Sequence, residues 1–323
     1  MSLVAKQPLA FGAATIGNLY REVSDERAQA TLEAAWDAGI RHFDTAPHYG
    51  IGLSERRLGA FLQTKPRDEF ILSTKVGRLL DPADRIEGDD MAFEFAVPRT
   101  HVRRVDNSAG GIRRSLEDSL ERLGLDRVDI LYLHDPEEAP EGLEPALEQG
   151  LPALAALRRE GTASAIGVGS KDVAALTAAA KSGLADTLMI SGRFTLLEQP
   201  AAEELLPVMA ERGVAGVAVS IFNSGLLAKP RPASDARYEY AAAAGELVER
   251  ANRIADVCEA HGIDLPTAAI AFPLLHAAIE ARVVSASSPQ QMEQTAQRAA
   301  TPVPDGVWRD LVSAGLLDAA LVP

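Results

Sequence analysis

Residues 40–75 read IRHFDTAPHYGIGLSERRLGAFLQTKPRDEFILSTK, and this stretch contains the pattern that the rest of the chain repeats. A short apolar run, Ile40–Asp44, is followed by a helical pattern over Ser54–Gln63 and by a second apolar run, Phe70–Lys75. Short strands that alternate with helices are typical of βαβ units in a parallel sheet. The stretch therefore predicts a parallel α/β fold.

The same alternation continues along the chain and supplies eight candidate strands. They are Leu9–Ala14, Ile40–Asp44, Phe70–Lys75, Val128–His134, Ala163–Val168, Thr187–Ser191, Val214–Ser220 and Arg282–Ser285. Helical patterns lie between them, such as Ser24–Ala38, which opens on a capping serine, and Pro152–Glu160. Eight strand–helix units fit an α/β fold of the (β/α)8 TIM-barrel type in a single domain, typically of ~250 residues before insertions.

The predicted domain covers residues 1–323, because no linker rich in serine, proline or glycine divides the chain. Three segments exceed what a barrel needs: a long polar loop at about 78–107 and extra helical segments at about 235–275 and 304–318. Long loops in compact domains are usually functional lids or disordered. We expect the 78–107 loop, with Phe93 and Phe95 exposed in its middle, to close a pocket.

Composition limits the possible partners. The chain has 47% hydrophobic and 24% charged residues, as globular proteins do, and a formal net charge of −14. An acidic chain with a pI of about 4.9 is unsuited to nucleic acid or an anionic membrane surface, because those partners require clustered Lys and Arg. The single cysteine, Cys258, fits a buried thiol in a reducing compartment. We expect a cytoplasmic protein with no nucleic-acid partner, no membrane span and no metal site, whose oligomeric state the sequence leaves open.

Three candidate strands end on residues that carry chemistry. Asp44 closes the run IRHFD, Lys75 closes FILSTK and His134 closes VDILYLH. Because a barrel builds its active site at the carboxyl ends of the strands, these side chains of neighbouring strands should converge at its mouth. Tyr49 lies five residues after Asp44 and can lean over the same patch. We predict Asp44, Tyr49, Lys75 and His134 as the catalytic group.

Each of these residues alone has an ordinary structural explanation, such as a turn cap for Asp44, but four on adjacent strand ends favour a site. A nearby ammonium favours the phenolate of a tyrosine, whose ordinary pKa is ~10. Lys75 can supply that charge and Asp44 can hold Lys75, while neutral His134 can orient a substrate oxygen. None of the four carries a hydride, so carbonyl reduction or alcohol oxidation requires a cofactor, of which nicotinamide is the simplest.

No G-x-G-x-x-G motif follows the first strand, so a dinucleotide would not be held as in a Rossmann domain. Barrels hold phosphates with the loops after strands seven and eight, which here are Ser220–Pro230 and Ser285–Thr295. The second loop runs into a helix N-terminus, whose partial positive charge favours phosphate. The candidate cofactor-binding residues, including two after strand five, are Ser170, Lys171, Ser220, Asn223, Gly225, Ser285, Ser287, Gln291 and Gln294.

The stretch GIRHFDTAPHYGIGLSERRLGAFL at 39–62, with ILSTKVGR at 71–78 and DILYLHDP at 129–136, resembles the aldo-keto reductase superfamily in motif, order and spacing. The likeness extends over essentially the whole chain. It implies a barrel with NAD(P) bound across the strand ends, and it places the family tetrad on the four residues named above, with Tyr49 as general acid or base. The segments GRFTLLEQP, FNSGLLA and VWRDLVSAGLL resemble the branch of aldose 1-dehydrogenases (L-fucose and D-threo-aldose dehydrogenases) and pyridoxal 4-dehydrogenase.

The chain departs from the family pattern near the nicotinamide. Ser170 and Lys171 stand where the family usually has the asparagine that holds the carboxamide, and Ser191 stands where glutamine is common. These departures concern the contacts of the cofactor and leave the tetrad intact.

The family likeness also bears on the choice between NAD and NADP. The segment Ser285–Gln297 contains no basic residue of the kind that pairs with a 2′-phosphate, and the nearest are Arg282 and Arg298. We therefore expect NAD as the cofactor, with NADP possible if a basic residue beyond strand seven folds over the site, such as Lys229, Arg231 or Arg237.

The resemblance implies an NAD(P)-dependent oxidoreductase of a small molecule, which oxidises an aldose of the L-fucose or D-threo-aldose type at C1 to the lactone. Pyridoxal, or another aldehyde or ketone, is the alternative substrate. A Schiff-base aldolase that uses Lys75 is disfavoured, because Asp44 would keep its amine protonated. A nucleotide-binding sensor subunit with slow turnover is a further alternative, although an intact quartet favours the enzyme.

Overall fold

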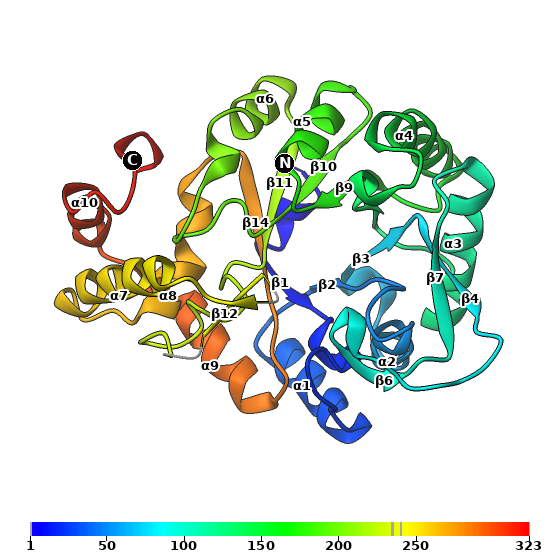
Figure 1. The fold of residues 1–323 in the computed structure, drawn as a ribbon, viewed down its shortest axis with the longest axis horizontal. Helices are drawn as coiled ribbons and strands as arrows, with labels where there is room; N and C mark the ends of the chain where they lie inside the picture. Colours follow the sequence, from blue (N-terminus) through cyan, green and yellow to red (C-terminus); the bar gives the residue numbers. More distant parts are fainter. Residues whose placement is uncertain (1, 234–235, 240, 323) are drawn as a thin grey trace.

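The computed structural model describes residues 2–233, 236–239 and 241–322, and a closed barrel of eight parallel strands forms its centre (Figure 1). In barrel order the strands are β1 (Leu9–Gly12), β14 (Ile279–Val284), β11 (Ala215–Val219), β10 (Thr187–Ser191), β9 (Ala165–Ser170), β8 (Ile130–His134), β3 (Ile71–Val76) and β2 (His42–Asp44). The first strand closes the barrel by pairing in parallel with both β14 and β2. The predicted (β/α)8 fold is confirmed.

Helices surround the barrel, and several of them begin at a capping side chain. The side chains of Ser24, Ser108, Asp172 and Ser288 each accept a hydrogen bond from a backbone N–H in the first turn. The helices are α1 (Asp25–Asp37), α2 (Leu53–Leu62), α3 (Ala109–Leu123), α4 (Leu143–Glu160), α5 (Val173–Lys181), α6 (Leu205–Arg212), α7 (Gly245–Ala260), α8 (Leu265–Ala271), α9 (Pro289–Ala300) and α10 (Asp305–Ser313).

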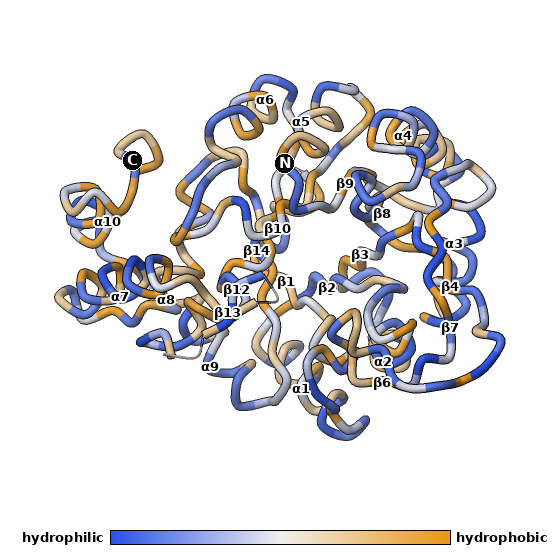
Figure 2. Tube along the Cα trace, viewed as in Figure 1, coloured by the Kyte–Doolittle hydropathy of each residue, from blue (hydrophilic) through white to orange (hydrophobic). Residues whose placement is uncertain are grey.

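The hydrophobic core has two layers. Side chains such as Val4, Tyr132 and Val217 fill the inside of the barrel, and a larger cluster lies between the strands and the helices. Close strand packing requires a glycine at one point, because a Cβ on Gly167 would lie 1.7 Å from the Thr187 carbonyl oxygen. Figure 2 shows hydrophobic and hydrophilic residues alternating along outer helices such as α7, as expected for helices that bury one face.

Residues 78–107 form an ordered excursion between β3 and α3. Strand β4 (Arg78–Pro82) pairs antiparallel with β7 (His101–Val105), and at the far end β5 (Asp89–Asp90) pairs with β6 (Phe95–Pro98). The expectation that Phe95 is exposed is wrong: its side chain is 3% exposed, whereas Phe93 is 43% exposed. Phe95 is buried because it packs in a small separate core with Ile51 and Leu80.

The excursion is bonded across the barrel mouth to the segment after β1. The Ala96 N–H donates to the Asn18 carbonyl at 2.9 Å, and the Tyr20 N–H donates to the Glu94 carbonyl at 2.7 Å. These backbone bonds hold the excursion against the β1–α1 segment, so its tip lies over the strand ends.

The other additions lie near the C-terminal part of the barrel. Strands β12 (Arg237–Tyr238) and β13 (Ala241–Ala242) pair antiparallel and precede α7 and α8 in the chain. Helix α10 packs against α7 outside the barrel, as Figure 1 shows at the left. Residue 235, where the expected helical segment begins, lies outside the described residues. In the described part of the chain, every helix is too short or too polar to cross a bilayer.

Candidate active site

The four predicted catalytic residues lie at one end of the barrel. Asp44 is the last residue of β2, Lys75 precedes the last residue of β3, and His134 ends β8. These three strands are neighbours in the order β8-β3-β2, and all eight strands run parallel, so their carboxyl ends share one rim. The structure therefore brings the sequence-predicted side chains together.

Lys75 and Asp44 form a buried ion pair. The Lys75 Nζ donates to Asp44 Oδ2 at 2.7 Å and to the Thr45 carbonyl at 3.0 Å, and Ser73 Oγ donates to Asp44 Oδ1 at 2.7 Å. Burial disfavours the ammonium, but the charge and hydrogen bond of Asp44 outweigh it and raise the pKa of Lys75. Lys75 is consequently a fixed cation, which disfavours the Schiff-base alternative.

The phenol of Tyr49 leans over this cation. Lys75 Nζ lies 4.7 Å from the centroid of the Tyr49 ring. Burial raises the pKa of Tyr49, and the positive charge of Lys75 acts in the opposite direction. Lys75 alone would lower the pKa of Tyr49, as expected from the sequence, but burial is the larger effect and the net shift is upward.

His134 completes the group as a neutral imidazole. Its ring centroid lies 6.3 Å from that of Tyr49, at an interplanar angle of 89°. Burial, with the positive charges of Arg78 and Lys75, lowers the pKa of His134 well below its ordinary value. His134 Nε2 lies 3.4 Å from Asp135 Oδ2, and burial raises the pKa of Asp135 to about 6.

Two residues at the mouth were missed by the sequence argument. His48 contacts both Tyr49 and His134, with ring centroids 6.3 Å and 5.7 Å apart. Arg103, from strand β7 of the excursion, donates from Nε to His48 Nδ1 at 2.7 Å. Their signals in the sequence were the position of His48 directly before Tyr49 and the several arginines of the 78–107 segment.

The residues expected to contact the nicotinamide lie at the end of β9. Ser170 is buried and donates from Oγ to Glu137 Oε1 at 2.5 Å, whereas Lys171 is exposed. Glu137 was not singled out in the sequence. Its Oε2 is buried and has no hydrogen-bond partner among the residues that the structure describes. Ser191, at the end of β10, forms a hydroxyl pair with Ser220 at 3.0 Å.

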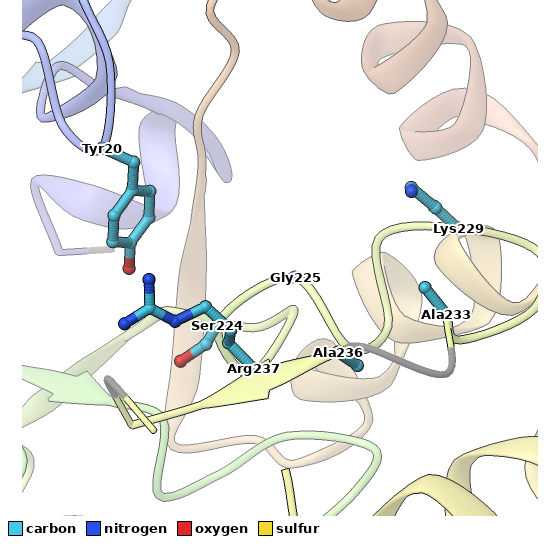
Figure 3. A pocket seen from close by; sticks show the side chains of 7 residues that line it. All are labelled: Tyr20, Ser224, Gly225, Lys229, Ala233, Ala236 and Arg237. Atoms are coloured by element: carbon cyan, nitrogen blue, oxygen red, sulfur yellow. The ribbon is translucent and has the colours of Figure 1, made fainter. Parts of the chain in front are cut away.

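The loop after β11 contains a run of left-handed residues beside a cavity. Ser220, Asn223, Ser224 and Gly225 all have positive φ, between 46° and 96°. Asn223 is 3% exposed, and its Oδ1 lacks a partner within the described ranges. The adjacent cavity, of about 340 Å³, is lined by Tyr20, Ser224, Gly225, Lys229, Ala233, Ala236 and Arg237. Figure 3 shows Tyr20 reaching from the segment after β1 toward the side chain of Arg237.

The segment after β14 meets two arginines that lie far away in the sequence. Arg21 Nη2 donates to Ser287 Oγ at 2.7 Å, and Arg27 Nε donates to the Ser287 carbonyl at 2.7 Å. Ser287 Oγ also bonds Gln291 Oε1 at 3.0 Å, while Ser285 and Gln294 are exposed. The expectation that Arg282 and Arg298 are the nearest basic residues is therefore wrong.

Three arginines that the sequence offered as partners of a 2′-phosphate bond other groups of the protein. Arg298 pairs with Asp264 at 2.7 Å, and Arg231 pairs with Asp256 and Glu259. Arg282 is buried and donates to the Ala299 carbonyl. Polar side chains, a buried amide oxygen and two cations near a helix N-terminus are groups that suit an extended dinucleotide.

Comparison with known proteins agrees with this geometry. Residues 8–315 match the Aldo/keto reductase family. The chain belongs to this family. It is an oxidoreductase, and the resemblance inferred from the motifs is confirmed.

Relatives within the aldo/keto reductase family cover nearly the whole chain. A D-threo-aldose 1-dehydrogenase from Pseudomonas sp is 53% identical over 311 residues, which are 96% of this chain and 94% of the relative. A pyridoxal 4-dehydrogenase from Microbacterium luteolum is 37% identical over 325 residues, with the same coverage of 96% and 94%. Both belong to the branch that the sequence motifs indicated.

Solved structures support the fold. A glycerol dehydrogenase from Gluconobacter oxydans superposes with a TM-score of 0.74 at 20% identity, covering 95% of this chain and 90% of that one. An aldo-keto reductase from Bacillus halodurans in its holo form gives a TM-score of 0.74 at 23% identity, covering 98% and 93%. At such identities the likeness concerns the barrel alone.

Proposed function

We propose that this aldo/keto reductase oxidises an aldose at C1 to the lactone, with Tyr49 as the general base and NAD as the cofactor. The observation that carries the proposal is the buried Lys75–Asp44 pair beneath the Tyr49 ring. The 53% identity to a D-threo-aldose 1-dehydrogenase supports the substrate class.

Each residue of the tetrad has one task in this reaction. Tyr49 takes the proton of the anomeric hydroxyl through its phenolic oxygen, and Lys75 stabilises the phenolate that must form first. Asp44 keeps Lys75 charged and in place, and neutral His134 donates a hydrogen bond to the substrate oxygen. A bound nicotinamide would supply the hydride acceptor that this oxidation at C1 requires.

The cofactor would be held along the rim by the residues predicted for it. Ser170, Lys171 and Ser220 would face the nicotinamide end, Asn223 and Gly225 the phosphates, and Ser285, Ser287, Gln291 and Gln294 the adenosine end. Arg21 donates to the Ser287 hydroxyl and Arg27 to its carbonyl, so these residues already have protein partners. We propose NAD because the segment Ser285–Gln297 contains no basic residue of its own. Arg21, which bonds the neutral Ser287 hydroxyl, is the cation beside this segment that NADP would use.

Measurement of kcat/KM for both nucleotides with one good aldose tests the cofactor choice. NAD should give the larger value. A preference for NADP would contradict this choice. The variants Arg21→Gln, Lys229→Gln and Arg237→Gln would then identify the cation that pairs with the 2′-phosphate, because loss of that cation should weaken NADP binding and leave NAD binding nearly unchanged.

Pyridoxal is the second candidate substrate, because a pyridoxal 4-dehydrogenase is 37% identical over almost the whole chain. A panel that contains D- and L-aldoses, pyridoxal and simple aldehydes, each with both nucleotides, separates the candidates through absorbance of the reduced nicotinamide. We expect aldose oxidation to exceed pyridoxal oxidation in kcat/KM. The reverse order would overturn the aldose assignment, and no turnover of any substrate would favour a sensor role.

A further inference from the structure

Three aromatic rings meet at the mouth of the barrel, and the proposed mechanism uses only two of them. His48 stands edge to face against His134, with centroids 5.7 Å apart at 86°, and against Tyr49, with centroids 6.3 Å apart at 67°. Its ring is partly exposed, whereas His134 is 9% exposed. His48 therefore borders both Tyr49 and His134 at the mouth of the barrel.

Residues of the excursion fix the orientation of the His48 ring and determine which of its nitrogens carries the proton. Arg103 donates from Nε to His48 Nδ1 at 2.7 Å and from Nη2 to the His48 carbonyl at 3.0 Å. Arg103 is itself held by Asp90, which accepts two hydrogen bonds at 2.8 and 2.6 Å. The side chains of Arg103 and Asp90 are 6% and 1% exposed, so this ion pair is buried beside His48.

The bond from Arg103 determines which nitrogen of His48 carries the proton. A guanidinium has only donors, so His48 Nδ1 must accept and cannot carry hydrogen. The proton of the neutral ring then lies on Nε2. In the described part of the chain, no group bonds this nitrogen, and it remains a donor beside the reacting groups.

The surroundings of His48 fit a compact polyhydroxy substrate. Phe93 and Phe95 stand edge to face against the imidazole, with centroids 5.7 and 5.6 Å away, and the Arg103 guanidinium covers the Phe93 ring at 4.1 Å. Phe95 is buried, whereas Phe93 is 43% exposed and is the ring of the two that can contact an apolar C–H face of a sugar. A single directed donor can select one hydroxyl. Burial and the charge of Arg103 lower the pKa of His48 well below its ordinary value, which agrees with a neutral donor.

We propose that His48 is a specificity-determining residue, held by Arg103 and Asp90 as the Nε2–H tautomer so that it donates to the hydroxyl next to the reacting carbon of an aldose. The inference rests on the proposed function, because it assumes a hydroxylated substrate. It assigns Arg103 and Asp90 as positioning residues that act through His48. The excursion thus carries the selection of substrate, while the barrel strands carry the tetrad.

The tautomer can be read without any substrate. The full chain labelled with 15N-histidine contains six histidines, and the His48 signals are those lost in His48→Asn and in His48→Gln. Two-bond 1H–15N correlation at pH 7 should show a neutral ring protonated at Nε2. A ring protonated at Nδ1, or at both nitrogens, would overturn the inference.

Kinetics with a matched pair of substrates tests the role. Asn places a carbonyl oxygen near the position of Nδ1 and keeps the Arg103 bond but has no donor at Nε2, whereas Gln extends an amide donor to that position. The wild-type ratio of kcat/KM for an aldose over its 2-deoxy form should be about tenfold, the scale of one neutral hydrogen bond. His48→Asn should reduce this ratio to near one, mainly through KM, and His48→Gln should restore part of it.

Arg104→Gln is the control for a nonspecific effect of changing the excursion. Arg104 is the next residue of β7, and its exposed side chain pairs with Asp81 and Asp106. This variant should keep the wild-type ratio. The inference, but not the proposed function, would be overturned if His48→Asn kept the wild-type ratio of kcat/KM for the aldose over its 2-deoxy form. The same holds if kcat/KM fell equally for both substrates. No aldose oxidation by the wild type would instead overturn the proposed function.

Discussion

Burial and charge act in opposite directions on the phenol of Tyr49. Burial raises its pKa, and Lys75, with Nζ 4.7 Å from the ring centroid, lowers it. A group that exchanges a proton near neutral pH benefits from a lower pKa, so in the proposed mechanism Lys75 offsets part of the effect of burial on Tyr49.

Replacement of Tyr49 by Phe tests whether this phenol transfers the proton. The variant should lose on the order of 10²–10⁴ in kcat, the usual scale of acid–base catalysis, because the ring remains but the oxygen is absent. Nucleotide affinity, measured by quenching of protein fluorescence, should barely change. Near wild-type turnover would remove Tyr49 from the mechanism.

Lys75→Met tests the electrostatic role of the cation. Because Lys75 lowers a pKa that burial raises, its loss should move the pKa of Tyr49 further up. The rise of the oxidation rate with pH should then shift to higher pH, provided that chemistry is rate-limiting. Asp44 is left unpaired in this variant, so Lys75→Met combined with Asp44→Asn serves as the comparison. An unshifted pH profile in both variants would mean that Lys75 does not tune Tyr49.

At the scale of elements, a buried carboxylate ties α2 to α3 and β3. Glu55 in α2 is fully buried; it accepts from Thr74 Oγ1 at 2.9 Å and from Arg122 Nε, in α3, at 2.7 Å. The same two helices approach closely at Gly59, where a Cβ would lie 2.2 Å from the Leu123 carbonyl oxygen. This contact fixes the helix that follows the loop of Tyr49.

Arg122→Met should destabilise the fold strongly, because it leaves the Glu55 carboxylate buried without its cation. Loss of one partner of a buried pair typically costs about 3–5 kcal/mol, which urea unfolding would detect. Arg113→Met is the matched control, since Arg113 pairs with Glu160 on the surface, where both side chains are nearly half exposed. The control should cost less than about 1 kcal/mol. Equal losses in the two variants would contradict the importance of burial.

Helix α4 shows where local signals mislead. The sequence predicts a helix beginning at Pro152, because proline commonly occupies the first helical position. The helix instead begins at Leu143 and contains Pro152 in its interior. Leu147 and Leu151 are buried on the core side. Their packing accounts for a helix that continues through a residue costing ~3 kcal/mol in an isolated helix.

At the scale of the whole molecule, the expected cofactor contacts come from segments far apart in the sequence. Ser170 ends β9, Asn223 follows β11 and Ser287 follows β14. Arg21 reaches Ser287 from the segment after β1. A ligand that binds such segments together stabilises the folded state by mass action.

Saturating NAD should therefore raise the Tm. At a concentration of 100 Kd the stabilisation is ~2.7 kcal/mol, which corresponds to a shift of roughly 5 °C for a chain of this size. Differential scanning fluorimetry measures it, with nicotinamide alone as the control, because nicotinamide lacks the phosphates and the adenosine. An unchanged Tm at saturating NAD and NADP would contradict the proposed cofactor site.

The sequence by itself determined the barrel and its eight strands, and it predicted the four residues of the tetrad. The reason is local: apolar runs that alternate with amphipathic helices form parallel strands, and residues such as Asp44 and Lys75 that close neighbouring runs must share the rim. The strands and their shared rim can therefore be predicted without knowledge of any contact between distant segments.

Only the tertiary structure decided which residues of the excursion and of the expected cofactor loops contact one another. Phe95 is buried because the excursion folds back over Ile51, and the tautomer of His48 depends on Arg103, which lies 55 residues further along the chain. Arg21 meets Ser287 across 266 residues of sequence. Such contacts depend on the path of irregular segments around the barrel. Periodicity does not describe that path, because the backbone of a loop follows its packing against neighbours rather than a repeating pattern of side chains.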